Sequence, residues 1–277
     1  MPALALESLT RAFYLWNMKT TKPGKQNIWL VCLSLIGGLI IWQLAVKLTH
    51  LPAFILPAPL QVWGRLVEVV VNGSLWSNTW VTIQEVILGL SLGTILAILL
   101  GYLVAKSRLV ERLLSPYLVA SQAIPVVALA PLLVLWFGPG MFSKVLICGL
   151  IVFFPVLVNT IVGVRAVPEE LRDLMRSLHA SHVQIMVYLE LPAALPILLG
   201  GLRIGATLSV IGAVVGEFVG ADKGLGFLVN IARGQYDTAL VFVAIATLIA
   251  MALCLYGLVI LFERRLLKWR LSSGESL

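Results

Sequence analysis

Charged residues are scarce in this chain, and their scarcity excludes most soluble folds. Only 12% of its 277 residues are Asp, Glu, Lys or Arg, whereas 60% are hydrophobic and the mean hydropathy is +1.01. A soluble domain of this length carries roughly twice that share of charge. The apolar residues also fall in blocks, and about 20 in a row are enough to cross a bilayer as a helix. The composition therefore predicts a polytopic membrane protein.

Cysteine is also scarce, and the common catalytic motifs are missing. The three cysteines, Cys32, Cys148 and Cys254, each lie inside an apolar run, without the paired spacing of a disulfide or a zinc site. His179 and His182 have no third ligand nearby, which favours surface histidines over a metal site. The sequence contains no G-x-x-x-x-G-K-[ST] phosphate loop and no Ser, Cys or Lys beside a credible base. We therefore expect no enzyme activity, no metal and no cofactor in this chain.

The net charge of +7 is spread over short segments and makes no basic stripe, which argues against nucleic-acid binding. If the N-terminus is placed in the cytoplasm, 14 of the 20 Lys and Arg residues fall on inner segments and five on outer segments. Membrane proteins gather Lys and Arg on their cytoplasmic side. The sequence therefore predicts that both termini lie in the cytoplasm.

Six apolar runs predict six transmembrane helices in an all-α membrane protein. They cover residues 28–48, 82–105, 116–137, 144–164, 193–219 and 239–262. The first run is too long for the apolar part of a signal peptide, and no small-residue cleavage site follows it. We expect a cytoplasmic segment over 1–27, a membrane domain over 28–262 and a cytoplasmic tail over 263–277.

Between the first two runs, a short helix is expected to begin after Pro59, because proline is favoured at the first position of a helix. Apolar side chains recur there at helical spacing; they are Leu60, Val62, Trp63, Leu66, Val67 and Val70. This pattern favours a helix that lies in the membrane interface, with Trp63 at the level of the headgroups.

Prolines and small residues mark the spans that are candidates for a solute pathway. Pro125 and Pro131 interrupt the third run, and the carbonyls that they leave free must be satisfied by protein or water. A packing kink explains the same prolines equally well. The fifth run carries a stripe of small residues that fits either close helix packing, as between subunits, or a solute passage. The candidate pathway-lining residues are Pro125, Pro131, Ser209, Gly212 and Glu217.

Three charges lie within or beside the apolar runs, where an unpaired charge is costly. Arg203 and Glu217 are 14 residues apart, about 21 Å along a helix, so they cannot pair within the fifth run. We interpret both, and Glu85 at the start of the second run, as side chains that reach towards the interfaces. None of them makes a proton relay near the middle of the membrane.

Residues 169–192 read EELRDLMRSLHASHVQIMVYLELP and are too polar in their first half to lie in lipid. This segment is most simply explained as a docking surface for a soluble partner. Four residues fall on one helical face; they are Leu171, Leu174, Met175 and Leu178. We expect this face to enter a groove of the partner, although it could instead pack on the chain's own spans. The charged residues expected at the rim of the groove are Glu169, Glu170, Arg172, Asp173 and Arg176.

Residues 165–192 resemble the cytoplasmic coupling loop, or EAA motif, of permease subunits of binding-protein-dependent ABC importers, and Pro192 is expected to end this loop. The family pattern is E-A-A, three residues, G, nine residues and I-x-L-P. Here it falls on Asp173-Leu174-Met175, on His179 and on the four residues that end at Pro192, and Ala180 also fits. Two departures stand out: Leu174 and Met175 replace the small alanine pair, and His179 replaces the glycine of the turn. Glycine reaches a positive φ cheaply, whereas histidine does so at some cost.

The resemblance covers about residues 56–262. LPAPLQVW (56–63), IPVVALAPLLVLWFGPG (124–140) and GEFVGADKGLGFLV (216–229) are similar to the nitrate, sulfonate, taurine and bicarbonate permeases. Related members carry aromatic acids or precursors of thiamine and flavins. The coupling residues that the resemblance implies are Glu169, Glu170, Leu171, Asp173, Leu174, Met175, Leu178, His179, Ala180 and Pro192.

The same resemblance implies a type I importer of the bacterial cytoplasmic (inner) membrane. Such an importer contains two permease subunits, usually identical in this subfamily, two cytoplasmic ATPases that bind the ATP, and an external solute-binding protein. The solute would be nitrate, a sulfonate such as taurine, bicarbonate or a similar small molecule, or alternatively a precursor of thiamine or a flavin. A secondary transporter is disfavoured, because the middle of the spans lacks ion or proton ligands.

Overall fold

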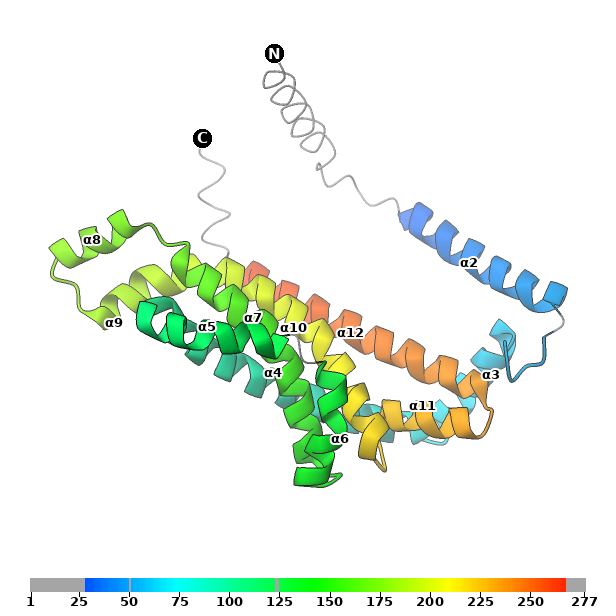
Figure 1. The fold of residues 1–277 in the computed structure, drawn as a ribbon. Coiled ribbons are helices and arrows are strands. Elements are labelled where there is room, and N and C mark those ends of the chain that lie inside the picture. The colour runs from blue at the N-terminus through cyan, green and yellow to red at the C-terminus, as the bar shows by residue number, and fades with distance from the viewer. Residues whose placement is uncertain (1–27, 50, 123–124, 268–277) are drawn as a thin grey trace, which may run out of the picture. The chain divides into compact units, whose positions relative to one another are not determined.

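The computed structural model describes residues 28–49, 51–122 and 125–267, and the elements within these ranges are all helical (Figure 1). The prediction of an all-α protein is therefore confirmed. The helices are α2 (Ile28–Thr49), α3 (Pro59–Val71), α4 (Ser74–Lys106), α5 (Arg108–Gln122), α6 (Val126–Phe137), α7 (Met141–Arg165), α8 (Glu169–Ser177), α9 (His182–Ile185), the π-helix η1 (Met186–Glu190), α10 (Leu191–Gly220), α11 (Leu225–Gly234) and α12 (Thr238–Leu266).

The chain divides into two compact units, Met1–Gln61 and Val62–Leu277. In the first unit, α2 is a 22-residue apolar helix, which corresponds to about 33 Å and is long enough to cross a bilayer. Apolar side chains such as Trp29, Leu33 and Leu44 are exposed on it. An apolar helix with exposed side chains of this kind suits contact with lipid.

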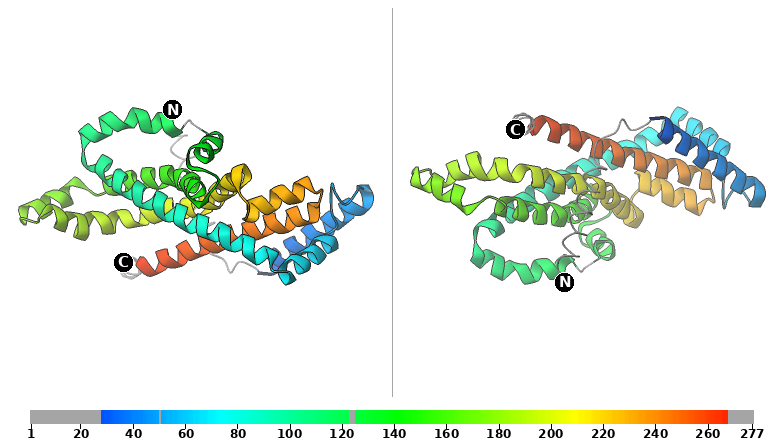
Figure 2. Two further views of the ribbon diagram at one scale, coloured as in Figure 1. Left: turned by 90° about the horizontal axis from the view of Figure 1, so that it is seen from below. Right: turned by 90° about the horizontal axis from the view of Figure 1, so that it is seen from above.

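The core of the second unit is built on α7, which packs along both α4 and α10 (Figure 2). Small residues allow these helices to approach closely. A Cβ atom on Gly93 of α4 would lie 2.4 Å from the carbonyl oxygen of Gly149, and one on Gly212 of α10 would lie 2.7 Å from Cα of Cys148. The stripe of small residues on the fifth run therefore packs against α7 within one subunit.

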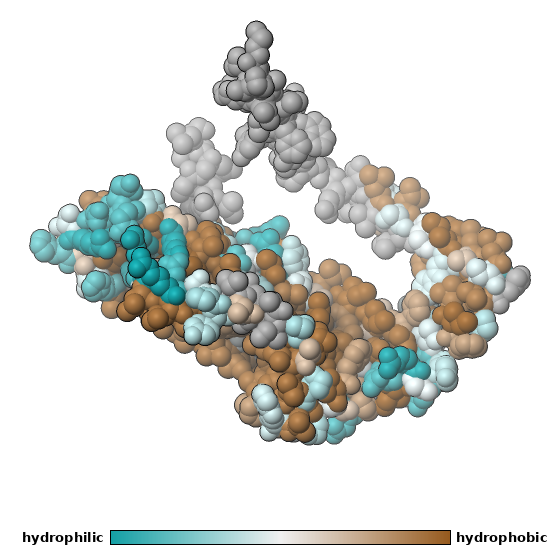
Figure 3. Space-filling view, in the orientation of Figure 1, coloured by the Kyte–Doolittle hydropathy of each residue, from teal (hydrophilic) through white to brown (hydrophobic). Residues whose placement is uncertain are grey.

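Among the described residues, five helical stretches are long and apolar enough to cross a membrane. These are Cys32–Thr49, Ser74–Lys106, Met141–Arg165, His182–Gly220 and Thr238–Leu266. They match five of the six predicted runs, although α4 begins eight residues before the predicted start at residue 82. Figure 3 shows hydrophilic residues gathered at the end that carries α8, and hydrophobic residues along the helices beyond it.

The predicted third run, 116–137, is not one continuous helix. α5 ends at Gln122 and α6 begins at Val126, after a non-helical Pro125; residues 123–124 lie outside the described residues. Proline lacks a backbone N–H and disfavours the helical region for the residue before it, so the break at this position has a local cause. α6 has only 12 residues, about 18 Å, and is too short to cross a bilayer alone.

The helix predicted after Pro59 is confirmed as α3, and its two faces differ. Val62, Leu66 and Val69 belong to a hydrophobic cluster with residues of α11 and α12. Trp63 and Val67 are exposed on α3, and the interfacial position of this helix stays a prediction. Arg65 Nη2 lies 2.8 Å from Oδ2 of Asp237, and Asp237 in turn caps the first turn of α12.

Candidate functional site

The segment predicted to dock a partner is an exposed amphipathic helix, α8. Leu171, Leu174 and Leu178 are 43, 56 and 69% exposed, and Met175 is half-buried. Glu169 and Glu170 in the first turn and Arg176 in the last turn complement the helix dipole. The described helices of this chain do not cover the leucine face, so packing on the chain's own spans is not what the structure shows.

The turn after α8 has the geometry that a glycine usually provides. His179 adopts a φ of 57°. The amide of His179 donates to the carbonyl of Arg176 at 2.9 Å, and that of Ala180 donates to the carbonyl of Met175 at 3.0 Å. These two bonds form a Schellman motif, which ends a helix with one left-handed residue. The turn is therefore formed in spite of the histidine that departs from the family pattern.

The chain then enters a second, longer helix. Ser181 caps it reciprocally: its side chain accepts from the amide of Gln184, whose own side chain accepts from the amide of Ser181. The helix widens into a π-turn, η1, immediately before Pro192, where proline removes one backbone donor. We expected Pro192 to end the loop, and this is wrong, because the helix continues from His182 to Gly220.

A buried carboxylate at the end of η1 ties this segment to the membrane helices. Glu190 is fully buried and accepts from Tyr102 Oη at 2.9 Å, from Lys106 Nζ at 2.8 Å and from Arg172 Nε at 3.2 Å. Charge-assisted bonds of this kind compensate for the cost of burying the carboxylate. We call Glu190 with these three partners the Glu190 cluster; it joins α8, α4 and the start of α10.

Arg172 was expected at the rim of the docking face, and this is wrong. Its side chain is only 15% exposed. Besides Glu190, it donates to the carbonyl of Val164 at 2.7 Å and to Oε2 of Glu169 at 3.0 Å. Arg172 therefore anchors α8 to the end of α7, while Glu170 and Asp173 remain exposed.

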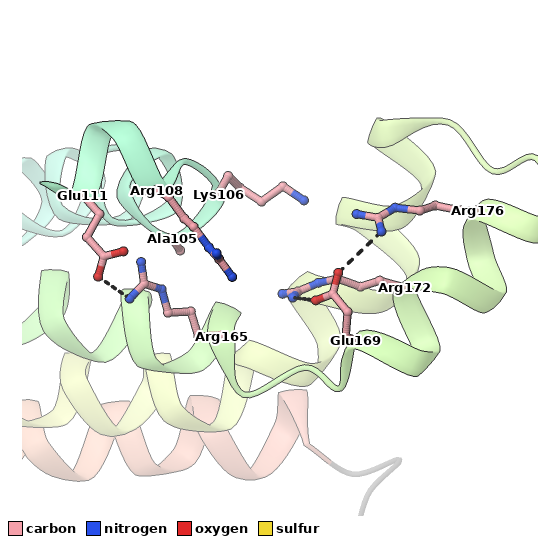
Figure 4. A pocket seen from close by; sticks show the side chains of 8 residues that line it. All are labelled: Ala105, Lys106, Arg108, Glu111, Arg165, Glu169, Arg172 and Arg176. Atoms are coloured by element: carbon pink, nitrogen blue, oxygen red, sulfur yellow. Dashed lines mark hydrogen bonds and ion pairs between the residues drawn. The ribbon is translucent and has the colours of Figure 1, made fainter.

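A polar pocket of about 760 Å³ lies beside α8, between it and the junction of α4 with α5 (Figure 4). At one side of this pocket, Arg165 donates to Oε1 of Glu111 at 2.7 Å, and this hydrogen bond lowers the pKa of Glu111. Arg176 lies 2.8 Å from Oδ1 of Asp173. The lining residues are Ala105, Lys106, Arg108, Glu111, Arg165, Glu169, Arg172 and Arg176.

A second buried cluster holds the start of α11. At the start of this helix, three consecutive backbone amides donate hydrogen bonds to side chains of other helices. Gly224 N donates to Asn78 Oδ1 and Leu225 N to Thr82 Oγ1, each at 2.8 Å, and Gly226 N donates to the carboxylate of Glu217. Thr82 Oγ1 also donates to Glu217 at 2.6 Å. Helix starts leave such amides unpaired, and a carboxylate suits their positive end.

The interpretation that the intramembrane charges reach the interfaces is wrong for Glu85 and Glu217; for Arg203, which is partly exposed, it stays a prediction. Glu217 and Glu85 are buried, and Lys144 Nζ of α7 lies 3.0 Å from Oε1 of Glu85. Arg203 pairs with Glu263 of α12. The energetic cost of an isolated charge in the membrane is thus met by partners on neighbouring helices.

Three of the five candidate pathway residues lie inside the helix packing. Ser209 and Gly212 are buried where α10 contacts α7, and Glu217 belongs to the cluster at α11, so none of them lines an open surface of the described subunit. Pro125 and Pro131 are exposed before and within α6. Their role in a pathway stays a prediction.

The second unit is thus a bundle of apolar helices with an exposed amphipathic helix, α8, at one end. Residues 89–268 match the family described as binding-protein-dependent transport system inner membrane component. The chain belongs to this family, and it is a permease subunit of an ABC importer rather than an enzyme. Within the described residues, no group of three His, Cys, Asp or Glu side chains is placed to hold a metal ion.

The chain is similar to two curated relatives, and it shares its fold with one solved structure. It is 50% identical to the riboflavin transport system permease protein RibX of Chloroflexus aurantiacus, over 84% of this chain and 87% of the relative. It is 31% identical to the taurine transport system permease protein TauC of Escherichia coli, over 91% and 94%. A chain of the inward-facing MetNI methionine ABC transporter superimposes with a TM-score of 0.61 at 18% identity, over 68% of this chain and 94% of that one.

Proposed function

We propose that this subunit forms the solute pathway of its importer and couples ATP hydrolysis by a partner ATPase to uptake through α8. The observation that carries the proposal is the exposed leucine face of α8, a helix whose other side is anchored to the rest of the subunit. Leu171, Leu174 and Leu178 face outwards, while Arg172 holds the opposite side of α8 to Glu190. An apolar stripe of this kind suits insertion into a groove of a partner.

The Glu190 cluster connects α8 to the helices of the membrane domain, so that a movement of α8 can be transmitted to them. A displacement of α8 acts on Arg172, and through Glu190 on Tyr102 and Lys106 at the end of α4. Glu190 itself lies on the helix that continues into α10. Movement of the ATPases would therefore reach two membrane helices together, which suits alternating access by rigid-body motion.

The proposed assembly contains two ATPases on the cytoplasmic side, a second copy of this permease and an external solute-binding protein. The excess of Lys and Arg on the side of α8 supports an orientation with α8 and both termini in the cytoplasm of a bacterial cell. In this assembly the ATP is bound by the partner subunits, and the pathway runs through the permease pair.

For the solute, we favour a flavin-like heterocycle over a small anion. The chain shares 50% identity with RibX and 31% with TauC, which reverses the order suggested by the sequence motifs. The basic side chains inside the described spans also give little support to an anion pathway, because Lys144 is paired with Glu85 and Arg203 with Glu263. A sulfonate is the second candidate.

The docking role is tested by placing one positive charge on each of two faces of α8. Leu174→Lys puts the charge on the leucine face, whereas Ser177→Lys puts it on an exposed position outside that face. In vesicles that contain the ATPase, the binding protein and a panel of riboflavin, taurine and nitrate, we expect Leu174→Lys to abolish solute-stimulated ATP hydrolysis and uptake. Ser177→Lys should retain both. Equal activity of the two variants would overturn the docking role.

A further inference from the structure

The pocket beside α8 has an excess of basic side chains. Five basic side chains and two carboxylates line it, and Glu190 and Asp173, which pair with three of the basic side chains, bring the net charge to +1. Figure 4 shows that Lys106 and Arg108 reach into the pocket from one side and Arg172 from the other. Cations that converge on one space repel each other, and an anion placed between them removes that cost.

Most of these cations are already paired, and one is not. Lys106 and Arg172 share Glu190, Arg165 binds Glu111, and Arg176 binds Glu169 and Asp173. Within the part of the chain that the structure describes, Arg108 takes part in no ion pair. Its guanidinium has two parallel donors, a geometry that matches a phosphate or carboxylate group. Arg108 is therefore the side chain of the pocket with capacity for an external anion.

The position of the pocket indicates where the anion comes from. Lys106 and Arg165 are the last residues of α4 and α7, two helices long enough to cross the membrane, so the pocket lies at the level of an interface. α5, which starts at Arg108, carries an exposed apolar stripe of Leu109, Leu113 and Tyr117, at four-residue spacing. An amphipathic helix with basic residues at the membrane surface suits contact with anionic lipids.

We propose that this pocket binds the phosphate group of an anionic phospholipid, with Arg108 as its main ligand and the lipid chains beside the apolar stripe of α5. The occupant would bridge Arg108 of α5 to Arg172 of α8 and so stiffen the docking helix. The effect on coupling rests on the proposed function of α8, whereas the binding of the lipid does not.

The test compares Arg108→Gln with Arg265→Gln, which removes an exposed arginine at the same end of the bundle, on α12. The complete transporter is placed in nanodiscs of phosphatidylcholine with or without phosphatidylglycerol, and retained lipid is counted by native mass spectrometry. We expect Arg108→Gln to weaken retention of phosphatidylglycerol about tenfold, the value of one charge-assisted contact. Arg265→Gln should behave as the unaltered protein does.

Three results would overturn the lipid assignment. The first is equal retention of phosphatidylglycerol by both variants and the unaltered protein. The second is an Arg108-dependent effect of inorganic phosphate alone in a neutral bilayer, which would mean that the pocket is filled from solution. The third is retention of lipid only in permease freed of its ATPase, which would mean that a partner carboxylate fills the pocket. Because retention is measured without ATP hydrolysis, a failure here leaves the docking role of α8 untouched, and the reverse also holds.

Discussion

At the scale of single residues, the buried charges of the described structure hold separate segments together through hydrogen bonds and ion pairs. Glu190 accepts from two cations and one hydroxyl, and Glu217 accepts from a hydroxyl and a backbone amide. Removing one member of such a cluster leaves the others buried without a partner, which costs more than the bond itself contributes. Substitution of either residue is therefore expected to destabilise the protein, although neither residue touches the docking face.

His179 is a residue whose conformation could be predicted from the sequence. The glycine of the family pattern falls on this position, and the structure places the histidine at the positive φ that a glycine would adopt. Glu190 could not be predicted in the same way. Its partners Lys106 and Tyr102 lie 84 and 88 positions away, and no local spacing connects them. The same holds for Glu217, whose partner Thr82 is 135 positions distant.

The turn at His179 gives a prediction of its own. His179→Gly should retain coupled transport, because glycine adopts the left-handed conformation freely. His179→Val should reduce solute-stimulated hydrolysis, since a β-branched residue at this φ costs roughly 1–2 kcal/mol or more and loosens the end of α8. Hydrogen exchange of residues 175–182, together with ATPase assays, checks both variants. A valine variant with full protection and full activity would show that the turn does not control the docking helix.

At the scale of elements, the predicted helices follow hydrophobic runs, and the errors lie where a local break or a distant contact intervenes. The run 116–137 was long enough for one span, but Pro125 interrupts it and the helix restarts at Val126. Close helix packing was one of two interpretations of the small residues of α10, beside a solute passage, and the structure shows such packing within one subunit. Their partner, α7 of the same subunit, could not be read from spacing, because spacing identifies a face and not what covers it.

The start of α11 gives a prediction at this scale. Gly224 has a φ of 126°, and a Cβ atom there would lie 2.1 Å from Oε1 of Glu217. Gly224→Ala should therefore break the cap of α11 and destabilise the protein by about 1–3 kcal/mol. Gly234→Ala, at the other end of α11, has open space and should be neutral. Thermal unfolding in detergent distinguishes the two, and equal melting temperatures would contradict the described cap.

At the scale of the whole molecule, the second unit holds α4 and α10 together at both ends. Glu190 joins the start of α10 to Tyr102 and Lys106, and Glu217 near the end of α10 joins it to Thr82. The two carboxylates are separated by 27 residues, about 40 Å of helix. We expect α4, α7 and α10 to move as one rigid body when α8 is displaced, so that the energy of the ATPase reaches the far side of the membrane.

The measurement that tests this coupling most directly is the number of solute molecules taken up per ATP hydrolysed, in vesicles that contain the complete transporter. Glu190→Gln keeps the shape of the side chain but removes the charge that binds Lys106 and Arg172. Tyr102→Phe removes one contact and is the milder companion. Both variants are compared as monodisperse complexes, so that loss of folding is excluded. The account predicts that Glu190→Gln continues to hydrolyse ATP but loses most uptake, with Tyr102→Phe between it and the unaltered protein. If Glu190→Gln took up as many solute molecules per ATP as the unaltered protein does, this result would contradict the proposed coupling.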